Sequence, residues 1–240
     1  MRSVPMGHAI RDYLRAVGAI VSKDLTAERR SKELVSTMLV FSLLVVLIFN
    51  FALQLDRSAR ENVAAGVLWV TFVFAGTLGL NRSLSMEKDR GSLDGLLLAP
   101  VDRSALFFGK MLGNLIFMAA VEVVILPVFT VLFNISLLRP WLFLVVALGT
   151  LGYATVGTLL SSMAVHTRAR DVMLPILLFP VAVPVVVAAV QASSGVLLAE
   201  AGRTVGTLWE TIGTWVNLLI VYDVIFMAIA FMLFDYVVEE

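Results

Sequence analysis

Six long apolar runs, separated by short polar segments, organise the sequence. They cover residues 35–55, 63–81, 111–133, 140–165, 172–198 and 214–238. An α-helix rises about 1.5 Å per residue, so each run is long enough to cross the roughly 30 Å of hydrocarbon in a bilayer. The pattern therefore predicts an all-α integral membrane protein with six transmembrane helices.

Lys and Arg are divided unevenly between the polar segments. Segments on the side of the amino terminus hold 7, 5, 2 and 0 of them, and segments on the other side hold 2, 1 and 1. One side thus carries 14 of the 18 basic residues. Because cytoplasmic loops are enriched in Lys and Arg, we expect both termini and the loop 82–110 to be cytoplasmic.

The composition leaves no room for a soluble catalytic domain. The chain has 240 residues, of which 60% are hydrophobic and 15% charged, which is too apolar for an ordinary soluble domain. We divide it into a cytoplasmic segment, 1–34, and a six-span domain, 35–240. Since 34 mostly polar residues precede the first run, we expect that run to be a retained anchor, not a cleaved signal peptide.

An amphipathic helix is predicted over residues 8–25, before the first span. Apolar residues recur there at spacings of three, four and seven, with charged residues elsewhere on the helix. The helix would lie in the lipid headgroup zone or pack on a soluble partner. The apolar positions are Ile10, Tyr13, Leu14, Val17, Ile20 and Val21.

The inner loop after the second span contains a short apolar stretch between Gly91 and Pro100. Leu93, Leu96 and Leu97 would share one face of a short helix. That helix would dock into a groove on a cytoplasmic partner or lie against lipid, and the pattern alone leaves both open. Asp102 or Ser104 would cap the third span.

Two connections are also predicted from the pattern. Residues 56–62 are expected to form a tight turn between the first two spans. Arg82, at the end of the second span, is expected to extend toward the headgroups.

The fifth run contains Pro175, Pro180 and Pro184. Each proline removes a backbone donor and clashes with the preceding turn. We therefore expect this span to bend or break, and residues 191–195 to form a re-entrant hairpin with 199–213.

Two acidic residues lie near the middle of spans, Glu122 in the third and Asp223 in the sixth. A charged side chain at the bilayer centre costs at least about 2.5–3.5 kcal/mol, so each requires a reason. The carboxyl groups would line a translocation path or coupling site, or hydrogen-bond to a neighbouring helix. Their depth is similar, but the sequence does not show whether they face each other.

No catalytic or metal-binding motif is evident, and we expect the chain not to be an enzyme. Gly109-Lys110 lacks the earlier glycine and the following Ser or Thr of a phosphate-binding loop. The chain has no cysteine, which excludes thiolate metal sites and disulfides. Its two histidines, His8 and His166, fall in predicted cytoplasmic segments, so axial haem ligation at the outer face is not expected.

The inner loop resembles that of the ABC-2 class of ABC-transporter membrane subunits. It reads E-x-x-x-G-x-L-x-x-L-L-x-x-P-V-x-R from Glu87 to Arg103. In that class the loop is a coupling helix that docks on a separate ATPase. The resemblance implies that Leu93, Leu96 and Leu97 fill the ATPase groove. It places Gly91 in the same surface, with the charged residues at its rim: Glu87, Asp89, Arg90 and Arg103.

A narrower resemblance is to the cytochrome c maturation B subunits, also called haem exporter B subunits. It rests on G-L-N-R-S at 79–83, G-L-L-L-A-P-V-D-R-S-A at 95–105 and L-P-I-L-L-F-P-V-A-V-P at 174–184. Y-D-V-I-F at 222–226 and L-F-D-Y-V at 233–237 extend it. The resemblance covers nearly the whole chain except residues 1–7 and 192–213.

The family implies a permease subunit of an ABC complex for c-type cytochrome biogenesis in the bacterial inner membrane. A partner ATPase would bind ATP and Mg, and other membrane subunits would handle haem, with no cofactor held by this chain and two copies of it in the complex. ATP hydrolysis would serve release of the haem-loaded chaperone. The alternatives are an ABC-2 exporter of a lipid or polysaccharide and an ATP-independent carrier that uses Glu122 and Asp223.

Overall fold

A computed structural model describes residues 6–53, 57–89, 103–164, 170–200 and 207–237. Seven α-helices account for nearly all of these residues, and no strand occurs among them. They are α1 (Met6–Ser31), α2 (Glu33–Ala52), α3 (Arg57–Asp89), α5 (Arg103–Phe133), α6 (Pro140–Ala164), α7 (Arg170–Glu200) and α8 (Leu208–Val237).

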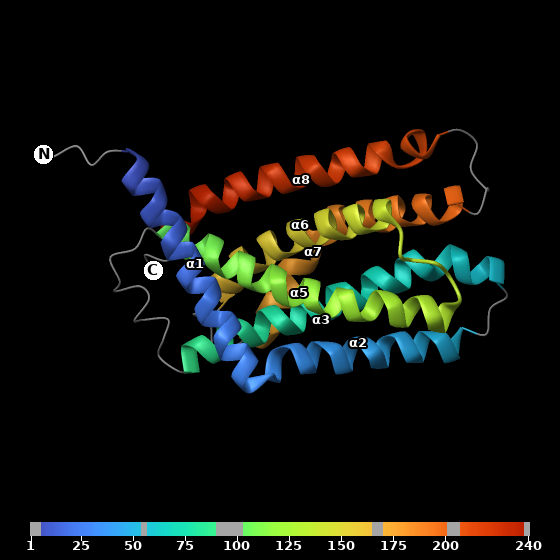
Figure 1. The fold of residues 1–240 in the computed structure, drawn as a ribbon, viewed down its shortest axis with the longest axis horizontal. Coiled ribbons are helices and arrows are strands. Elements are labelled where there is room, and N and C mark those ends of the chain that lie inside the picture. Colours follow the sequence, from blue (N-terminus) through green and yellow to red (C-terminus); the bar gives the residue numbers. More distant parts are fainter. Residues whose placement is uncertain (1–5, 54–56, 90–102, 165–169, 201–206, 238–240) are drawn as a thin grey trace, which may run out of the picture.

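Helices α2, α3, α5, α6, α7 and α8 are long and apolar enough to span a membrane, which confirms the six-span prediction. They lie side by side as a bundle, with α2 along one edge and α8 along the other (Figure 1). Helix α1 crosses one end of this bundle at an angle, in front of α5. The helix predicted over residues 8–25 is therefore present and is longer than expected. We call the end that holds α1 the α1 end.

Helix α6 is the centre of the bundle and contacts α3, α5, α7 and α8. Small residues allow this close approach, because side chains from other helices lie where a Cβ would be. Trp69 lies over Gly149, Leu80 over Gly157, and Asp223 over Gly152. The glycines of the fourth run therefore have the packing role that their composition suggests.

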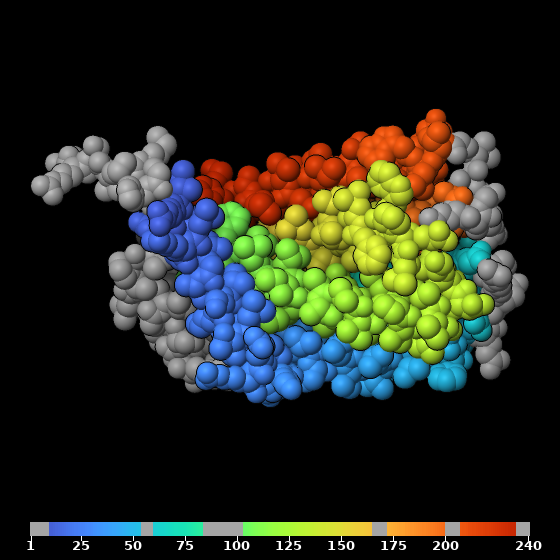
Figure 2. All heavy atoms as spheres, in the orientation of Figure 1, coloured from blue at the N-terminus to red at the C-terminus, as the bar shows by residue number. Residues whose placement is uncertain are grey.

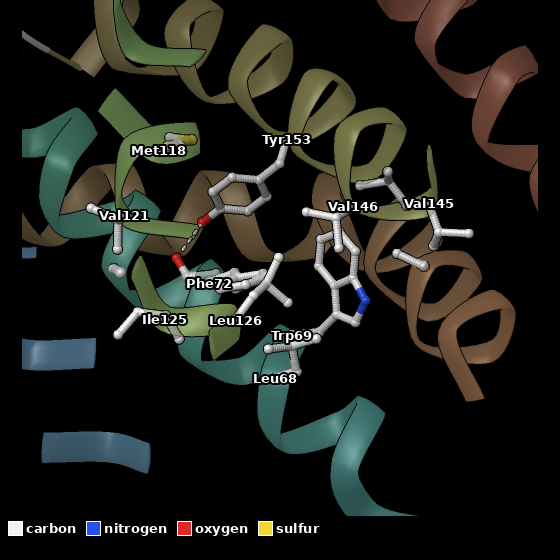
Figure 3. Packing of buried hydrophobic residues seen from close by; sticks show 14 of the residues in the cluster. Leu68, Trp69, Phe72, Met118, Val121, Ile125, Leu126, Val145, Val146 and Tyr153 are labelled. Atoms are coloured by element: carbon white, nitrogen blue, oxygen red, sulfur yellow. Dashed lines mark hydrogen bonds between the residues drawn. The ribbon is translucent and has the colours of Figure 1, made fainter. Parts of the chain in front are cut away.

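Buried polar side chains join the helices around α6. The indole nitrogen of Trp69 on α3 donates a 2.9 Å hydrogen bond to Ser193 Oγ on α7. The hydroxyl of Tyr153 on α6 lies 2.7 Å from that of Thr77 on α3. It also donates a 3.0 Å hydrogen bond to the backbone carbonyl of Val73 on α3, and Figure 3 shows Tyr153 within the buried cluster. A buried polar group without a partner is costly in hydrocarbon, so these bonds favour one arrangement of the helices over alternatives.

Three local predictions are wrong. Residues 57–62 do not form a turn but belong to α3, which also continues past Arg82 to Asp89. Ser104 does not cap the third span, because it is the second residue of α5. The expected re-entrant hairpin is also wrong within the described residues, since α7 runs through 191–195 to Glu200 and α8 begins at Leu208.

Of the predicted bend or break at Pro175, Pro180 and Pro184, the break does not occur, because all three lie inside the single helix α7. Pro184 cannot donate to the carbonyl of Pro180, which leaves one turn short of a donor. In that turn the hydroxyl of Tyr222 on α8 donates a 2.9 Å hydrogen bond to the carbonyl of Val181. This carbonyl is next to the one that Pro184 leaves without a donor, so α8 contacts the α7 backbone directly at this turn.

Candidate functional site

A buried ion pair lies at the contact between α1 and the first turns of α5. We call this contact the α1 joint: Ile20, Asp24, Gly109, Lys110 and Gly113. Ile20 packs where a side chain on Gly109 would be. Lys110 Nζ donates a 2.8 Å hydrogen bond to Asp24 Oδ2, and both side chains are largely buried. The joint therefore combines close helix packing with a buried ion pair.

The sequence positions of the joint explain why α1 docks here. Val17, Ile20 and Asp24 follow one another at helical spacing, so they share a face of α1. Val17 and Ile20 are buried. Nearer the amino end of α1, the hydroxyl of Tyr13 on the same face accepts a 3.2 Å hydrogen bond from Ser104 of α5. One face of α1 thus packs against α5 over several turns.

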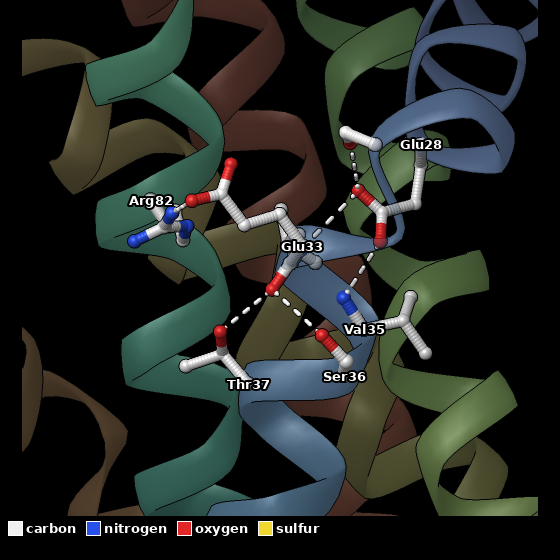
Figure 4. Close-up of polar contacts among 8 residues, drawn as sticks. Glu28, Glu33, Val35, Ser36, Thr37 and Arg82 are labelled. Atoms are coloured by element: carbon white, nitrogen blue, oxygen red, sulfur yellow. Dashed lines mark hydrogen bonds and ion pairs between the residues drawn. The ribbon is translucent and has the colours of Figure 1, made fainter.

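Glu28 connects α1 to α2. Its carboxylate accepts hydrogen bonds from the backbone nitrogens of Leu34, at 3.3 Å, and Val35, at 2.8 Å (Figure 4). The first turn of a helix leaves its N–H groups without partners, and Lys32, which precedes α2, provides no side-chain cap. Lys32 also has a positive φ of 54°, which sets the sharp change of direction between α1 and α2.

Glu33, the first residue of α2, forms an ion pair with Arg82 near the end of α3 (Figure 4). Arg82 therefore has a protein carboxylate as its partner, and its extension toward the headgroups stays a prediction. With the α1 joint, this pair attaches the α1–α2 unit to both helices that flank residues 90–102, which are α3 before them and α5 after them.

The residues of the predicted coupling surface are only partly within the described structure. Glu87 and Asp89 belong to the last turns of α3, and Arg103 is the first residue of α5. The other members lie outside the described residues, so their docking role stays a prediction. These are Arg90, Gly91, Leu93, Leu96 and Leu97.

Glu122 on α5 is buried in the middle of the bundle and has a partner. Thr150 on α6 donates a 2.5 Å hydrogen bond from its hydroxyl to Glu122 Oε1. Only 6% of the Glu122 side chain is exposed. The contact is of the kind expected for a carboxyl group that joins two helices.

Asp223 on α8 is equally buried, but neither of its carboxylate oxygens has a hydrogen-bond partner among the described residues. Its Oδ1 lies against Gly152 of α6. Glu122 and Asp223 thus both abut α6, at positions two residues apart on that helix. Because successive residues on a helix turn by about 100°, they contact different sides of α6, and no hydrogen bond between them is present.

The described residues contain no group of three His, Cys, Asp or Glu side chains placed to hold a metal. The side chains of His8 and His166 are not among those described. The arrangement offers buried ion pairs and hydrogen bonds between helices, which hold helices in position.

The sequence reasoning did not identify Asp24, Glu28, Lys110 and Thr150 as partners in these contacts. One signal was available for Asp24, because it is an acid at a position that continues the apolar face of Val17 and Ile20. A second was the spacing of Gly109 and Gly113 on either side of Lys110, which is typical of close helix packing. Neither signal gives the partner, which depends on the tertiary fold.

Taken together, six spanning helices joined by internal polar contacts define a multi-pass integral membrane protein. Residues 15–233 match the CcmB protein family, and the chain belongs to that family. The resemblance to B subunits of cytochrome c maturation is thereby confirmed.

Three relatives are each named heme exporter protein B. The one from Rhodobacter capsulatus is 29% identical over 70% of this chain and 78% of its own. That from Paracoccus denitrificans is 26% identical over 72% and 80%. That from Pseudomonas aeruginosa is 26% identical over 69% and 75%.

Proposed function

We propose that this chain is the membrane subunit of a haem-exporter ABC complex in the bacterial inner membrane, where it serves c-type cytochrome biogenesis. The observation that carries the proposal is the family match over residues 15–233, with relatives named heme exporter protein B. The six spans fit a membrane subunit. A separate subunit binds ATP and Mg and hydrolyses ATP, and further membrane subunits handle haem.

The mechanical route begins at the inner loop, whose apolar face of Leu93, Leu96 and Leu97 docks on the ATPase. Glu87, Asp89, Arg90 and Arg103 set its register at the rim. Movement of the loop shifts the adjoining ends of α3 and α5 together. Both ends are attached to the α1–α2 unit, through Arg82–Glu33 and Lys110–Asp24.

The connection to α6 then carries the movement through the membrane. Helix α5 is joined to α6 by Asn114–Thr158 and by Glu122–Thr150, and α3 by Thr77–Tyr153. Helices joined by buried hydrogen bonds move as units. The ATPase cycle therefore reaches the far side of the membrane as a tilt of packed helices, where it drives release of the haem-loaded chaperone.

The first experiment is purification of the tagged full-length chain in mild detergent, with its partners identified by mass spectrometry. The proposal expects a stoichiometric ATPase together with haem-handling membrane proteins. A deletion strain should also lose haem-stained c-type cytochromes. An ATPase alone, with cytochromes c intact, would instead identify an ABC-2 exporter of another cargo.

An active, partner-free protein would favour the ATP-independent carrier, for which Glu122 and Asp223 are the available acidic groups. That carrier would lose activity on Glu122→Gln or Asp223→Asn. The coupling function should tolerate both substitutions, because it does not require either carboxyl group to gain or lose a proton.

The docking surface is tested by Leu96→Asp or Leu97→Asp, with Leu98→Asp as the matched control. Leu98 lies about 140° from Leu93 on the expected helix and is outside the apolar face. We expect the first two variants to abolish copurification of the ATPase and cytochrome c maturation, while the control retains both. Equal activity in all three would contradict docking through this face.

A further inference from the structure

A groove runs between α1 and α5 at the α1 end of the bundle. It has a volume of about 580 Å³ and is open along one side. Its walls are mainly apolar: Leu14, Val17, Val21 and Leu25 from α1 face Leu112 from α5, and Arg29 lies at one end. The groove is thus an open, mainly apolar depression along α1, with Arg29 as the single cationic residue in its lining. In the space-filling view α1 forms a ridge across the neighbouring helices (Figure 2).

The length of α5 fixes the level of this groove in the bilayer. The helix has 31 residues, so it is about 46 Å long and exceeds the roughly 30 Å of hydrocarbon. Its charged residues Arg103 and Lys110 fall in the first eight positions, and the next one is Glu122. Hydrocarbon therefore begins close to Leu112, and the groove lies where acyl chains meet headgroups.

Arg29 differs in its bonding from the other charged side chains of α1 that line or flank the α5 contact. Asp24 is bonded to Lys110, and Glu28 is occupied by the backbone of α2. Arg29 has no ion pair with any described residue. An exposed arginine at the end of an apolar groove, at headgroup level, matches the shape and charge of an anionic lipid.

We propose that this groove binds one anionic phospholipid. An acyl chain lies along Leu14, Val17, Val21 and Leu25 against Leu112, and the phosphate is held by Arg29. A chain packed in this way contacts α1 and α5 at once, so the lipid stabilises the α1 joint. The proposal does not depend on the function proposed above, since it requires only that the six helices span a bilayer.

The test compares retention of phosphatidylglycerol and phosphatidylcholine by the full-length protein, purified in detergent and analysed by native mass spectrometry. We expect one phosphatidylglycerol to be retained in preference. A basic residue near the membrane surface contributes about 1 kcal/mol toward anionic lipid, so Arg29→Gln should weaken retention about fivefold. Arg30→Gln is the matched control, because Arg30 does not line the groove.

A second variant fills the groove without changing charge. A Cβ at Gly18 would meet no atom within 4 Å, so Gly18→Leu should fold normally and project into the free space. We expect it to lose the retained phosphatidylglycerol while its thermal stability in lipid-free detergent is unchanged.

Three results would overturn the proposal. The first is equal retention of both lipids by the unchanged chain. The second is an effect of Arg30→Gln as large as that of Arg29→Gln, which would mean general attraction to a basic helix. The third comes from a photo-cross-linker at Val21 in cell membranes: capture of a protein in place of lipid would show that a partner subunit occupies the groove.

Discussion

The α1 joint and the middle of the bundle both bury ionisable side chains, but the partners of these side chains differ. At the joint, Lys110 and Asp24 lie 2.8 Å apart, each partner supplying the charge that the other requires. In the middle, Glu122 has a hydroxyl as its partner and Asp223 has none among the described residues. The joint therefore uses charge to fix two helices together, whereas the middle of the bundle relies on packing.

The largest expected effect comes from breaking the pair at the joint. Lys110→Met leaves Asp24 largely buried without its main partner, and removing one member of a buried pair costs about 3 kcal/mol or more. Lys23, 3.3 Å from Asp24 and more exposed, offsets only part of this. We expect a loss of about 3 kcal/mol in the free energy of unfolding, measured by denaturant titration in detergent.

The control for that variant is the double substitution Asp24→Leu with Lys110→Met. An apolar pair of similar volume removes the uncompensated charge, so stability should return to near that of the unchanged chain. A double variant as unstable as Lys110→Met would mean that the joint depends on the ammonium group for some other contact.

Packing in the middle of the bundle is tested by Gly152→Ala. The added methyl would overlap the Asp223 carboxylate and lie 3.1 Å from Val185. Overpacking of this kind costs about 1–3 kcal/mol. Gly66→Ala is the matched control, because a Cβ there meets nothing within 4 Å. Thermal unfolding of the two variants should differ clearly, and similar stabilities would contradict the close approach of α8 to α6.

A smaller effect, of opposite sign, is expected from replacing the carboxyl group that has no hydrogen-bond partner among the described residues. Asp223→Asn keeps the shape and removes the cost of burying an ionisable carboxyl group in hydrocarbon. We expect unchanged stability or a gain of about 1 kcal/mol in the same denaturant titration. Glu122→Gln should be near neutral, since its amide oxygen still accepts from Thr150. A loss above about 1 kcal/mol in Asp223→Asn would reveal a partner outside the described residues.

The smallest effect is expected at the exposed pair of Glu33 and Arg82, whose side chains are 52% and 38% exposed. Exposed ion pairs contribute about 0–1 kcal/mol and are screened by salt. Glu33→Gln should lower the free energy of unfolding by about 0.5 kcal/mol or less, and by nothing measurable in 1 M salt. A large, salt-independent loss of stability would mean that this pair stabilises the fold as much as the Lys110–Asp24 pair does.

The six spans could be predicted because hydrocarbon imposes a minimum length of apolar sequence, which every run meets. The boundaries were less predictable. Residues 57–62 are polar yet helical, since nothing in a charged sequence prevents a helix from continuing beyond the bilayer. The prolines of α7 did not predict a continuous helix, yet α7 continues through all three, and the packing of Tyr222 from α8 against this turn is visible only in the fold.

The candidate site was likewise only partly predictable from the sequence. Glu122 and Asp223 were identified because a carboxyl group in an apolar run is conspicuous, but only the fold could assign Thr150 to one and leave the other without a partner. Asp24 and Lys110 are 86 residues apart, and each resembles an ordinary charged residue of a polar segment. The apolar face at Leu93, Leu96 and Leu97 stays a prediction from the sequence.

The long separation of Asp24 from Lys110 has a consequence for biosynthesis. Helix α1 leaves the ribosome before every span, yet the helix on which it packs is completed more than 80 residues later. At about 5–20 residues per second, α1 waits roughly 4 to 17 s for its partner. During that interval Asp24 has no Lys110 with which to pair, so the α1 joint can assemble only after the third span has been synthesised.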